Sequence, residues 1–338
     1  MKKRFFTILQ YLVFFGLGFF LVWWSIRDLT TEDKLLISQS LKHARYYLII
    51  PVFILLVASH FLRAVRWRLL ISSLGYQTKI SNTFFAVMVG YLANSAVPRL
   101  GEVLKCTLLA RYEKLPADKL IGTIILERII DVVSLLIVFG ITFVIQPDIF
   151  TELINAFFRS HHDQSRKRIP GYLIAVIFFS IIILVLLIWM IAKKKTLQDV
   201  VGLFKKIGRS IWQGISTIQH LRNRGIFILY TAGIWFLYFI SGYVGFYALQ
   251  ETEVYGAKEA FAILSAGSIG MTATPGGIGA YSILVQKTMQ VYGLNEAIAL
   301  AFGWILWIAQ EFVILVGGLI SFAAIPYFNK KKKQVETI

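Results

Sequence analysis

The sequence predicts an all-α protein: a polytopic integral membrane helical bundle in which two of the membrane segments are broken. Two observations predict this class. Of the 338 residues, 57% are apolar and only 16% are charged, with a mean hydropathy of +0.69, whereas a soluble domain carries about 25% charged residues. The unbroken apolar stretches reach about twenty residues, the length that a helix needs to cross hydrocarbon, and exceed the roughly ten-residue strands of outer-membrane barrels. A soluble enzyme with one anchor is therefore excluded.

Hydropathy predicts six full spans, which together with the two broken stretches give about eight membrane segments. The spans are 5–24, 46–62, 121–145, 171–192, 226–248 and 297–325. The first follows a basic N-terminus, as in a signal peptide, but its apolar run is too long and no small-residue cleavage site follows, so we expect an uncleaved span. We expect a single domain over 1–338, with an interfacial amphipathic helix at about 197–218 and a basic tail at 329–338.

Two apolar stretches, 80–112 and 259–292, are interrupted by proline and glycine. The first break contains Pro98 and Gly101, and the second contains Pro275, Gly276, Gly277 and Gly279. Because proline removes a backbone donor, each stretch is expected to form two half-helices. Each half is about 12 to 18 residues long, short for a span. We therefore favour re-entrant hairpins, while the rival arrangement, in which all four halves cross, remains open.

The basic residues predict the orientation. The net charge of +17 comes largely from loops, and the basic runs 193–195 and 330–333 each follow a span directly, so the positive-inside rule places both termini in the cytoplasm. We expect no nucleic-acid partner. The single cysteine, Cys106, excludes an intramolecular disulfide and a cysteine metal cluster, and no motif for a metal or another cofactor is present.

An internal repeat links the two breaks. A shift of 177 residues aligns five pairs: Phe84 with Phe261, Gly90 with Gly267, Ser95 with Thr272, Ala96 with Ala273, and Pro98 with Pro275. The order of two spans, a hairpin and a span then occurs twice, over about 1–145 and 171–325, with opposite orientation. Inverted repeats with discontinuous helices are typical of secondary transporters, whose substrate site lies near the midplane.

Charged residues at membrane depth are costly and need a partner or a polar cavity. The candidates are Arg99, Glu102, Glu127, Arg128, Asp131 and Glu311. Glu127 and Asp131 lie one helical turn apart and share a face. Arg99 or Arg128 could neutralise them, and the set is either a structural ion-pair network or a site for an anionic head group or for protons. Arg99 is the first candidate, because a guanidinium binds phosphate in a bidentate manner.

The ends of the half-helices add to the predicted anion site. The segment after Pro98 and the glycine-rich segment after Pro275 are expected to present backbone N–H groups at two facing helix N-termini. Glu311, midway along the last span, is expected to couple protons or to pair with a cation. Arg63, Arg66 and Arg68 are expected to reach cytoplasmic head groups, although Arg66 could turn inward. Lys105 is assigned to the cytoplasmic side, and Lys287 is expected to extend outward.

Four motifs together resemble a known family. They are Arg63–Arg68, Pro98–Glu102, Glu127–Asp131 and Thr274–Gly279. In this order they resemble the flippase-like transmembrane domain of lysylphosphatidylglycerol synthases, which also occurs as stand-alone membrane proteins of bacteria and archaea. The resemblance implies movement of a phospholipid or a lipid-linked head group between leaflets. Tyr281–Ser282 stands where family members often carry an acid, and we expect no aminoacyl-transferase domain and hence no aminoacylation.

The functional prediction is therefore a lipid transporter of flippase or scramblase type, and not an enzyme. The predicted substrate-binding residues are Pro98, Arg99, Gly101, Glu102, Glu127, Arg128, Asp131, Pro275, Gly276, Gly277, Gly279 and Glu311. The partner is a membrane phospholipid or another anionic lipid-linked substrate. Two alternatives remain: a membrane-embedded enzyme acting on a lipid carrier, and an accessory subunit that presents lipid to a synthase or glycosyltransferase partner.

Overall fold

The computed structural model describes residues 2–27, 29–158, 221 and 223–335 of the chain, and this part is helical without a strand. The all-α class predicted from the sequence is confirmed. The predicted span 171–192 and the predicted interfacial helix 197–218 lie outside the described residues.

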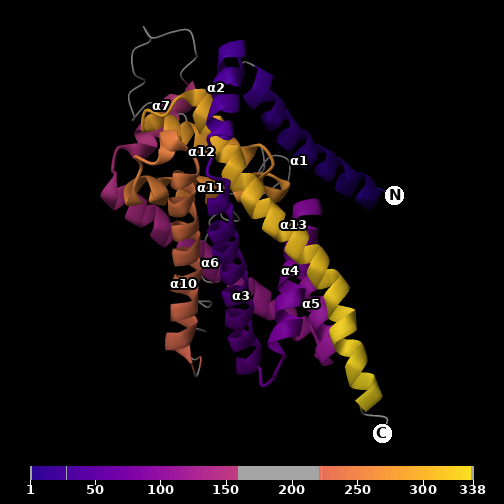
Figure 1. Cartoon of the computed structure of the whole chain (residues 1–338). Helices are drawn as coiled ribbons and strands as arrows, with labels where there is room; N and C mark the ends of the chain where they lie inside the picture. The colour runs from indigo at the N-terminus through magenta and orange to yellow at the C-terminus, as the bar shows by residue number, and fades with distance from the viewer. Residues whose placement is uncertain (1, 28, 159–220, 222, 336–338) are drawn as a thin grey trace, which may run out of the picture.

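The α-helices are α1 (Lys2–Arg27), α2 (Thr31–Lys42), α3 (Ile49–Ser73), α4 (Ile80–Ala96), α5 (Leu100–Glu113), α6 (Ala117–Ile145), α7 (Ile149–Phe158), α10 (Arg224–Gly245), α11 (Ala257–Ala273), α12 (Ala280–Val291) and α13 (Glu296–Val335). Short 3-10 helices are η1 (Tyr46–Leu48), η2 (Phe246–Ala248), η3 (Gln250–Thr252) and η4 (Pro275–Gly277). Figure 1 shows α3, α10 and α13 running along the length of the bundle.

Within the described residues, four helical segments are long and apolar enough to cross a membrane. They are Tyr46–Ser73, Ala117–Ile145, Arg224–Ala248 and Glu296–Lys330, and each coincides with a span predicted from hydropathy. The lipid-facing surface of these helices is apolar, as the high exposure of Leu136, Val144 and Phe322 shows. Because such side chains are stable only out of water, the chain is a multi-pass membrane-embedded protein.

Two segments differ from the predicted connections. The loop predicted at 25–45 contains α2, which begins with a capping box: the Thr30 hydroxyl accepts from the Asp33 amide, and the Asp33 carboxylate accepts from the Thr30 amide at 2.9 Å. This reciprocal pairing satisfies two helix-end donors and explains a helix in a polar segment. At the other end, α13 continues through Pro326 into the basic tail instead of ending near residue 325.

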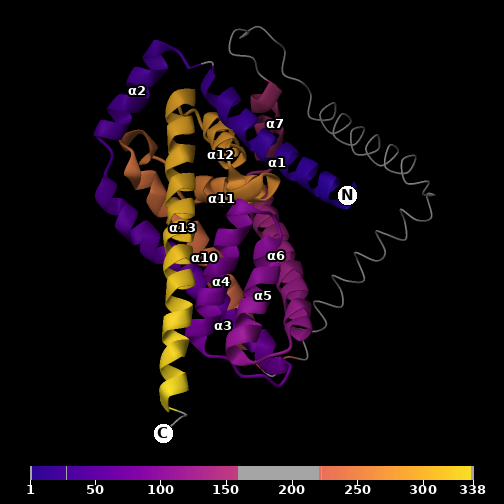
Figure 2. The same ribbon diagram turned by 90° about the vertical axis from the view of Figure 1, so that its right-hand side faces the viewer.

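Each broken stretch folds back on itself as a hairpin. At the α4–α5 crossing, a Cβ on Gly101 would lie 1.8 Å from the Gly90 carbonyl oxygen, and at the α11–α12 crossing a Cβ on Gly270 would lie 2.5 Å from the Tyr281 Cα. Only glycine allows backbones to approach this closely. The structure therefore favours the hairpin arrangement over four crossing halves. Figure 2 shows α4 and α5 in the lower part of the bundle and α11 and α12 in the upper part.

The spacing of the elements supports the inverted repeat. Helices α4 and α11 both have 17 residues, and both their first and their last residues are 177 positions apart. In each half a long helix precedes the hairpin and another follows it, and α4 contacts α13 just as α11 contacts α6. Each half has its own apolar core, one around Trp67 and Leu109 and the other around Phe246 and Phe302, and α3 packs against α10 to join them.

Candidate functional site

Seven charged side chains from three helices meet inside the first half of the bundle. We call this group the charge cluster. Its members are Arg63 and Arg66 of α3, Glu102 and Lys105 of α5, and Glu127, Arg128 and Asp131 of α6. Arg63 lies ten residues before the end of α3 and Glu127 ten residues after the start of α6, which places both about 15 Å from the helix ends. The cluster therefore lies well inside two helices that are long and apolar enough to cross a membrane.

Asp131 holds the two arginines of α3. Its two oxygens accept from Arg63 Nη1 and Arg66 Nη2, both at 2.8 Å. The arginines are three residues apart and so face α6 together. Arg66 is fully buried, and Arg63 is 8% exposed. Removing such charges from water is costly unless each is paired, so Asp131 is essential to this arrangement.

Glu127 is paired chiefly with Lys105. Lys105 Nζ donates to Glu127 Oε2 at 2.7 Å and lies over the Trp67 ring, 4.7 Å from its centroid. Glycine at position 90 makes room for the lysine stem, because a Cβ there would lie 3.0 Å from the Lys105 Cβ. Trp67 is itself fixed by donating to Thr123 Oγ1 at 2.8 Å. The hairpin is thus joined to α6 through a buried ion pair.

Helix α10 completes the polar surroundings of the arginines. Arg63 Nε donates to the Tyr238 hydroxyl at 3.1 Å, and Arg66 Nη1 donates to Thr231 Oγ1 at 3.4 Å. The Tyr91 ring of α4 lies 5.9 Å from the Arg63 guanidinium carbon. Two helices besides α6, α4 and α10, therefore contact Asp131's partners, which leaves the two α3 arginines little freedom to move.

Arg128 is held differently from the other basic groups of the cluster. Its closest approaches to Glu102, Glu127 and Asp131 are 3.7 to 3.8 Å, beyond hydrogen-bond range. Its side chain is 41% exposed, and its Nε, like that of Arg66, is buried without a hydrogen-bond partner. Among the described basic groups of the cluster, Arg128 is therefore the one whose guanidinium can change partners at the smallest cost.

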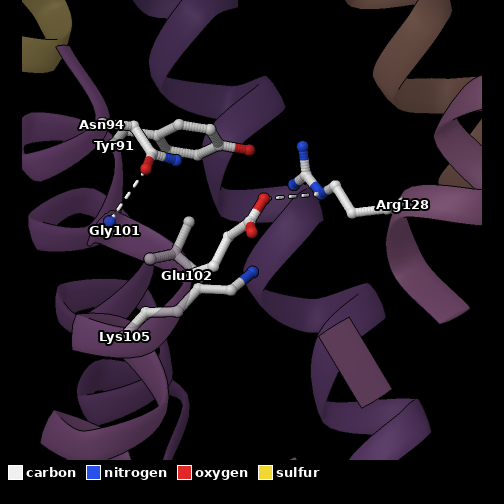
Figure 3. A pocket seen from close by; sticks show the side chains of 8 residues that line it. Tyr91, Asn94, Gly101, Glu102, Lys105 and Arg128 are labelled. Carbon is white, nitrogen blue, oxygen red and sulfur yellow. Dashed lines mark hydrogen bonds and ion pairs between the residues drawn. The ribbon is translucent and has the colours of Figure 1, made fainter. Parts of the chain in front are cut away.

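A small pocket lies where Arg128 faces the first hairpin. It is lined by Val87, Gly90, Tyr91, Asn94, Gly101, Glu102, Lys105 and Arg128. In Figure 3, Arg128 extends from α6 toward Glu102, while Lys105 lies below them on the hairpin. Asn94 shapes the rim because its Oδ1 accepts from the Gly101 amide at 2.8 Å. With Arg63, Arg66, Lys105 and Arg128 against three carboxylates, the cluster has one surplus positive charge at this pocket.

Arg99 lies apart from the cluster. It is exposed at the tip of the first hairpin, beside Pro98, and precedes α5 with φ at 69°. Among the described residues it makes no hydrogen bond or ion pair. A left-handed conformation is uncommon for a residue other than glycine and is concentrated at functional and strained sites. Arg99 is thus not the neutralising partner of Glu127 and Asp131; Arg63, Arg66 and Lys105 have that role.

The second break is a tight turn that needs its glycines. Gly276, Gly277 and Gly279 have φ of 58°, 70° and 73°, values that other residues rarely adopt. Gly279 also lies against α1, since a Cβ there would be 2.8 Å from the Gly18 carbonyl oxygen. Pro275 is buried at the start of this turn.

The structure does not support an anion site formed by two helix N-termini whose backbone amides are all unpaired. At the second break, the amides of Gly277, Ile278 and Ala280 donate to carbonyl groups within the turn. At the first break, the Leu100 amide donates to the Val97 carbonyl and the Gly101 amide to Asn94. The local turns use these donors because buried amides need partners. The positive charge that the structure places near these breaks includes that of Arg63, Arg66, Lys105 and Arg128.

Glu311 lies at the junction of the two hairpins and not in the charge cluster. A Cβ on Gly276 would be 3.5 Å from its carboxylate atoms, and the Ser95 side chain, at the end of α4, interacts with the carboxylate. Trp307, one turn earlier on α13, donates to the Gly276 carbonyl at 2.7 Å. No described lysine or arginine forms an ion pair with Glu311.

Two sequence-based placements of basic residues are wrong, and an alternative left open for a third is confirmed. Arg63 is not at head groups but buried on Asp131, and Arg66 turns inward onto Asp131 as well, the alternative that the sequence left open. Lys105 belongs to the buried cluster and not to a cytoplasmic loop. Lys287 pairs with Glu296 at 3.0 Å. The sequence contained a signal for the positions of Arg63 and Arg66. Two arginines three residues apart on one apolar helix and two acids four residues apart on another can face each other, which predicts ion pairs between the helices.

These features define the chain as a multi-pass helical membrane protein with two hairpins and a buried charge cluster. The chain belongs to the lysylphosphatidylglycerol synthase TM region family, whose model matches residues 8–318. It is also similar to a UPF0104 membrane protein of Methanocaldococcus jannaschii, at 29% identity over 86 residues; the match covers 25% of this chain and 26% of that relative. No solved structure matches the chain.

Proposed function

We propose that this protein is a lipid transporter of flippase or scramblase type, without catalytic activity, that moves a lipid with an anionic phosphate head group across a bacterial inner membrane. The observation that carries the proposal is the position of Arg128: half-exposed at a pocket, loosely held, and part of a cluster with one surplus positive charge. A phosphate oxygen at Arg128 would form charge-assisted hydrogen bonds that the 3.7 to 3.8 Å contacts do not provide.

The tightly paired groups of the cluster would keep their positions when the lipid binds. Arg63, Arg66 and Lys105 keep Glu127 and Asp131 neutralised, so the arriving phosphate meets positive rather than negative charge. Glu102, at 3.8 Å from Arg128 and 32% exposed, would be displaced toward solvent. Arg99 at the hairpin tip would offer a second, exposed cation, so that the head group moves between two arginines while its acyl chains remain in the bilayer.

The proposed orientation has both termini in the cytoplasm, with the α4–α5 hairpin entering from the cytoplasmic side and the α11–α12 hairpin from the outside. The basic residues near the cytoplasmic ends of α5 and α13, among them Arg111 and Lys330, support it. In this arrangement the lipid head group reaches the Arg128 pocket from the inner leaflet.

A reconstituted-vesicle assay tests the proposal. Full-length protein in vesicles containing a trace of fluorescent anionic phospholipid should transfer the label between leaflets, measured by quenching with a membrane-impermeant reductant. Arg128→Gln should slow transfer about tenfold, the effect of losing one charge-assisted hydrogen bond. The matched control, Arg111→Gln, changes an exposed arginine on α5 outside the pocket and should transfer lipid at the parent rate. Equal rates for all three proteins, or no transfer by the parent, would contradict the proposal.

A further inference from the structure

The two hairpins approach one another at one buried carboxyl group. Glu311 is 7% exposed, and its Oε1 has no hydrogen-bond partner. From the first hairpin it meets the side chain of Ser95, and from the second it meets the Gly276 backbone. Because Ser95 precedes the first break and Gly276 lies within the second, a change at Glu311 acts on both breaks at once.

The neighbours of Glu311 offer no compensating charge. Along α13, Ala309 and Val313 on either side of it belong to an apolar cluster with Val52 and Leu56 of α3. From α4 and the second break, the facing groups are the Ser95 hydroxyl and the Gly276 backbone. Among the described residues, no charged side chain forms an ion pair with Glu311. An ionised carboxylate buried without a cation or enough donors costs several kcal/mol.

The donor set also favours a proton over a metal cation. The described oxygen atoms at this point are the Glu311 carboxylate and the Ser95 hydroxyl, while the Gly276 carbonyl already accepts from Trp307. Within the described chain, no group of three histidine, cysteine or acidic side chains is placed to hold a metal. Hard cations require about six oxygen ligands, whereas a proton requires one oxygen atom and a route to water.

We propose that Glu311 is a proton-binding site that couples the two hairpins, and this inference rests on the proposed lipid transport. The proton forms an O–H bond with the carboxylate oxygen when the hairpin tips are together, as in the structure. When water reaches the junction, the proton leaves to water and the resulting carboxylate is unstable between Ser95 and Gly276, which favours separation of the tips. Protonation from the opposite side then closes them again, so a pH gradient sets the direction of lipid movement.

Two measurements on the full-length reconstituted protein test the inference. The first follows the infrared C=O band of protonated carboxyl groups as pH is raised. The parent should show a band near neutral pH that Glu311→Gln lacks, whereas Glu296→Gln, a control at the external end of the same helix, should keep it. If the two variants and the parent show the same band, the proton site is wrong, whether or not the protein transports lipid.

The second measurement compares lipid transfer under pH gradients of opposite direction. The parent and Glu296→Gln should differ several-fold between the two directions, and Glu311→Gln, which resembles the protonated state and preserves the packing, should transfer equally in both. Proton coupling would be overturned if transfer by the parent did not depend on the pH gradient, or if it depended on a sodium gradient at fixed pH. Neither result would contradict lipid transport. Absence of transfer by the parent would instead refute the proposed function, and the infrared result would still decide the proton site.

Discussion

In the first half of the bundle the hairpin α4–α5 shares a cluster of seven charged side chains with α3 and α6. In the second half the hairpin α11–α12 meets the buried carboxyl group of Glu311 and, at the start of α13, a Lys287–Glu296 ion pair. The shift of 177 that aligns the hairpins pairs Gly90 with Gly267 but Lys105 with Ser282. Ser282 is fully buried and its hydroxyl has no hydrogen-bond partner. The backbone plan is therefore repeated, while the buried charge cluster is not repeated at the corresponding positions of the second half.

This difference indicates that the two halves of the bundle have separate roles. A charged cluster needs a rigid frame, because each buried charge must stay paired, and α3, α6 and α10 provide that frame around Asp131. The second half instead has three left-handed glycine positions within four residues, at a tight turn. We interpret the first half as the binding half and the second as the half that responds to Glu311. The predictions below test this division.

Removal of the Asp131 carboxylate should have the largest effect. Asp131→Ala leaves Arg63 and Arg66 buried without their 2.8 Å partners, and breaking a buried pair costs about 3 to 5 kcal/mol. Thermal unfolding in detergent should show a large fall in midpoint and a low folded yield. Asp118→Ala, at the exposed start of the same helix, should unfold like the parent. Similar stability of the two variants would mean that the cluster does not hold the first half together.

Substitution of the glycine at the hairpin crossing should destabilise both halves to a similar extent, since both halves have the same backbone arrangement there. A Cβ at Gly101 or at Gly270 would overlap backbone atoms of the facing half-helix, so Gly101→Ala and Gly270→Ala should each lower the free energy of unfolding by about 1 to 3 kcal/mol. Gly122→Ala, where a Cβ meets nothing within 4 Å, should be neutral or stabilising by up to about 1 kcal/mol. Tolerance of alanine at only one crossing would show that the two hairpins differ in packing.

The smallest effect is expected at the rim of the pocket. Asn94→Ala removes the acceptor for the Gly101 amide, and the loss of one such bond costs about 1 kcal/mol. Equilibrium unfolding in denaturant should detect this change, and Asn94→Asp, which keeps an acceptor at that position, should recover most of it. A loss as large as that of Asp131→Ala would mean that the rim is part of the rigid frame.

The sequence predicted the elements well, for physical reasons that particular residues illustrate. Apolar runs of about twenty residues located the helices around α3, α6, α10 and α13. Pro98 and Pro275, each with glycines close by, located both breaks, because proline removes a backbone donor from a helix. The short helix α2 was missed although Thr30 and Asp33 have the spacing of a capping box.

The partners within the site were harder to predict. Glu127 and Asp131 were identified from their depth, but which cations neutralise them depends on how α3, α5 and α6 are arranged in space. Hydropathy alone placed Lys105 outside the membrane, because it cannot show that the lysine stem crosses Gly90 to reach Glu127. Arg99 was predicted as a possible partner of Glu127 and Asp131 because it follows Pro98 in the sequence. In the structure it lies at the hairpin tip, away from both carboxylates.

Photo-crosslinking inside the pocket tests the central claim most directly. A photoreactive amino acid in place of Tyr91, which lines the pocket opposite Arg128, should label an anionic phospholipid in mixed vesicles far more than phosphatidylcholine, and Arg128→Gln in the same protein should remove that preference. Equal labelling of both lipids, or a preference that persists without Arg128, would contradict an anionic head-group site formed by the first hairpin and α6.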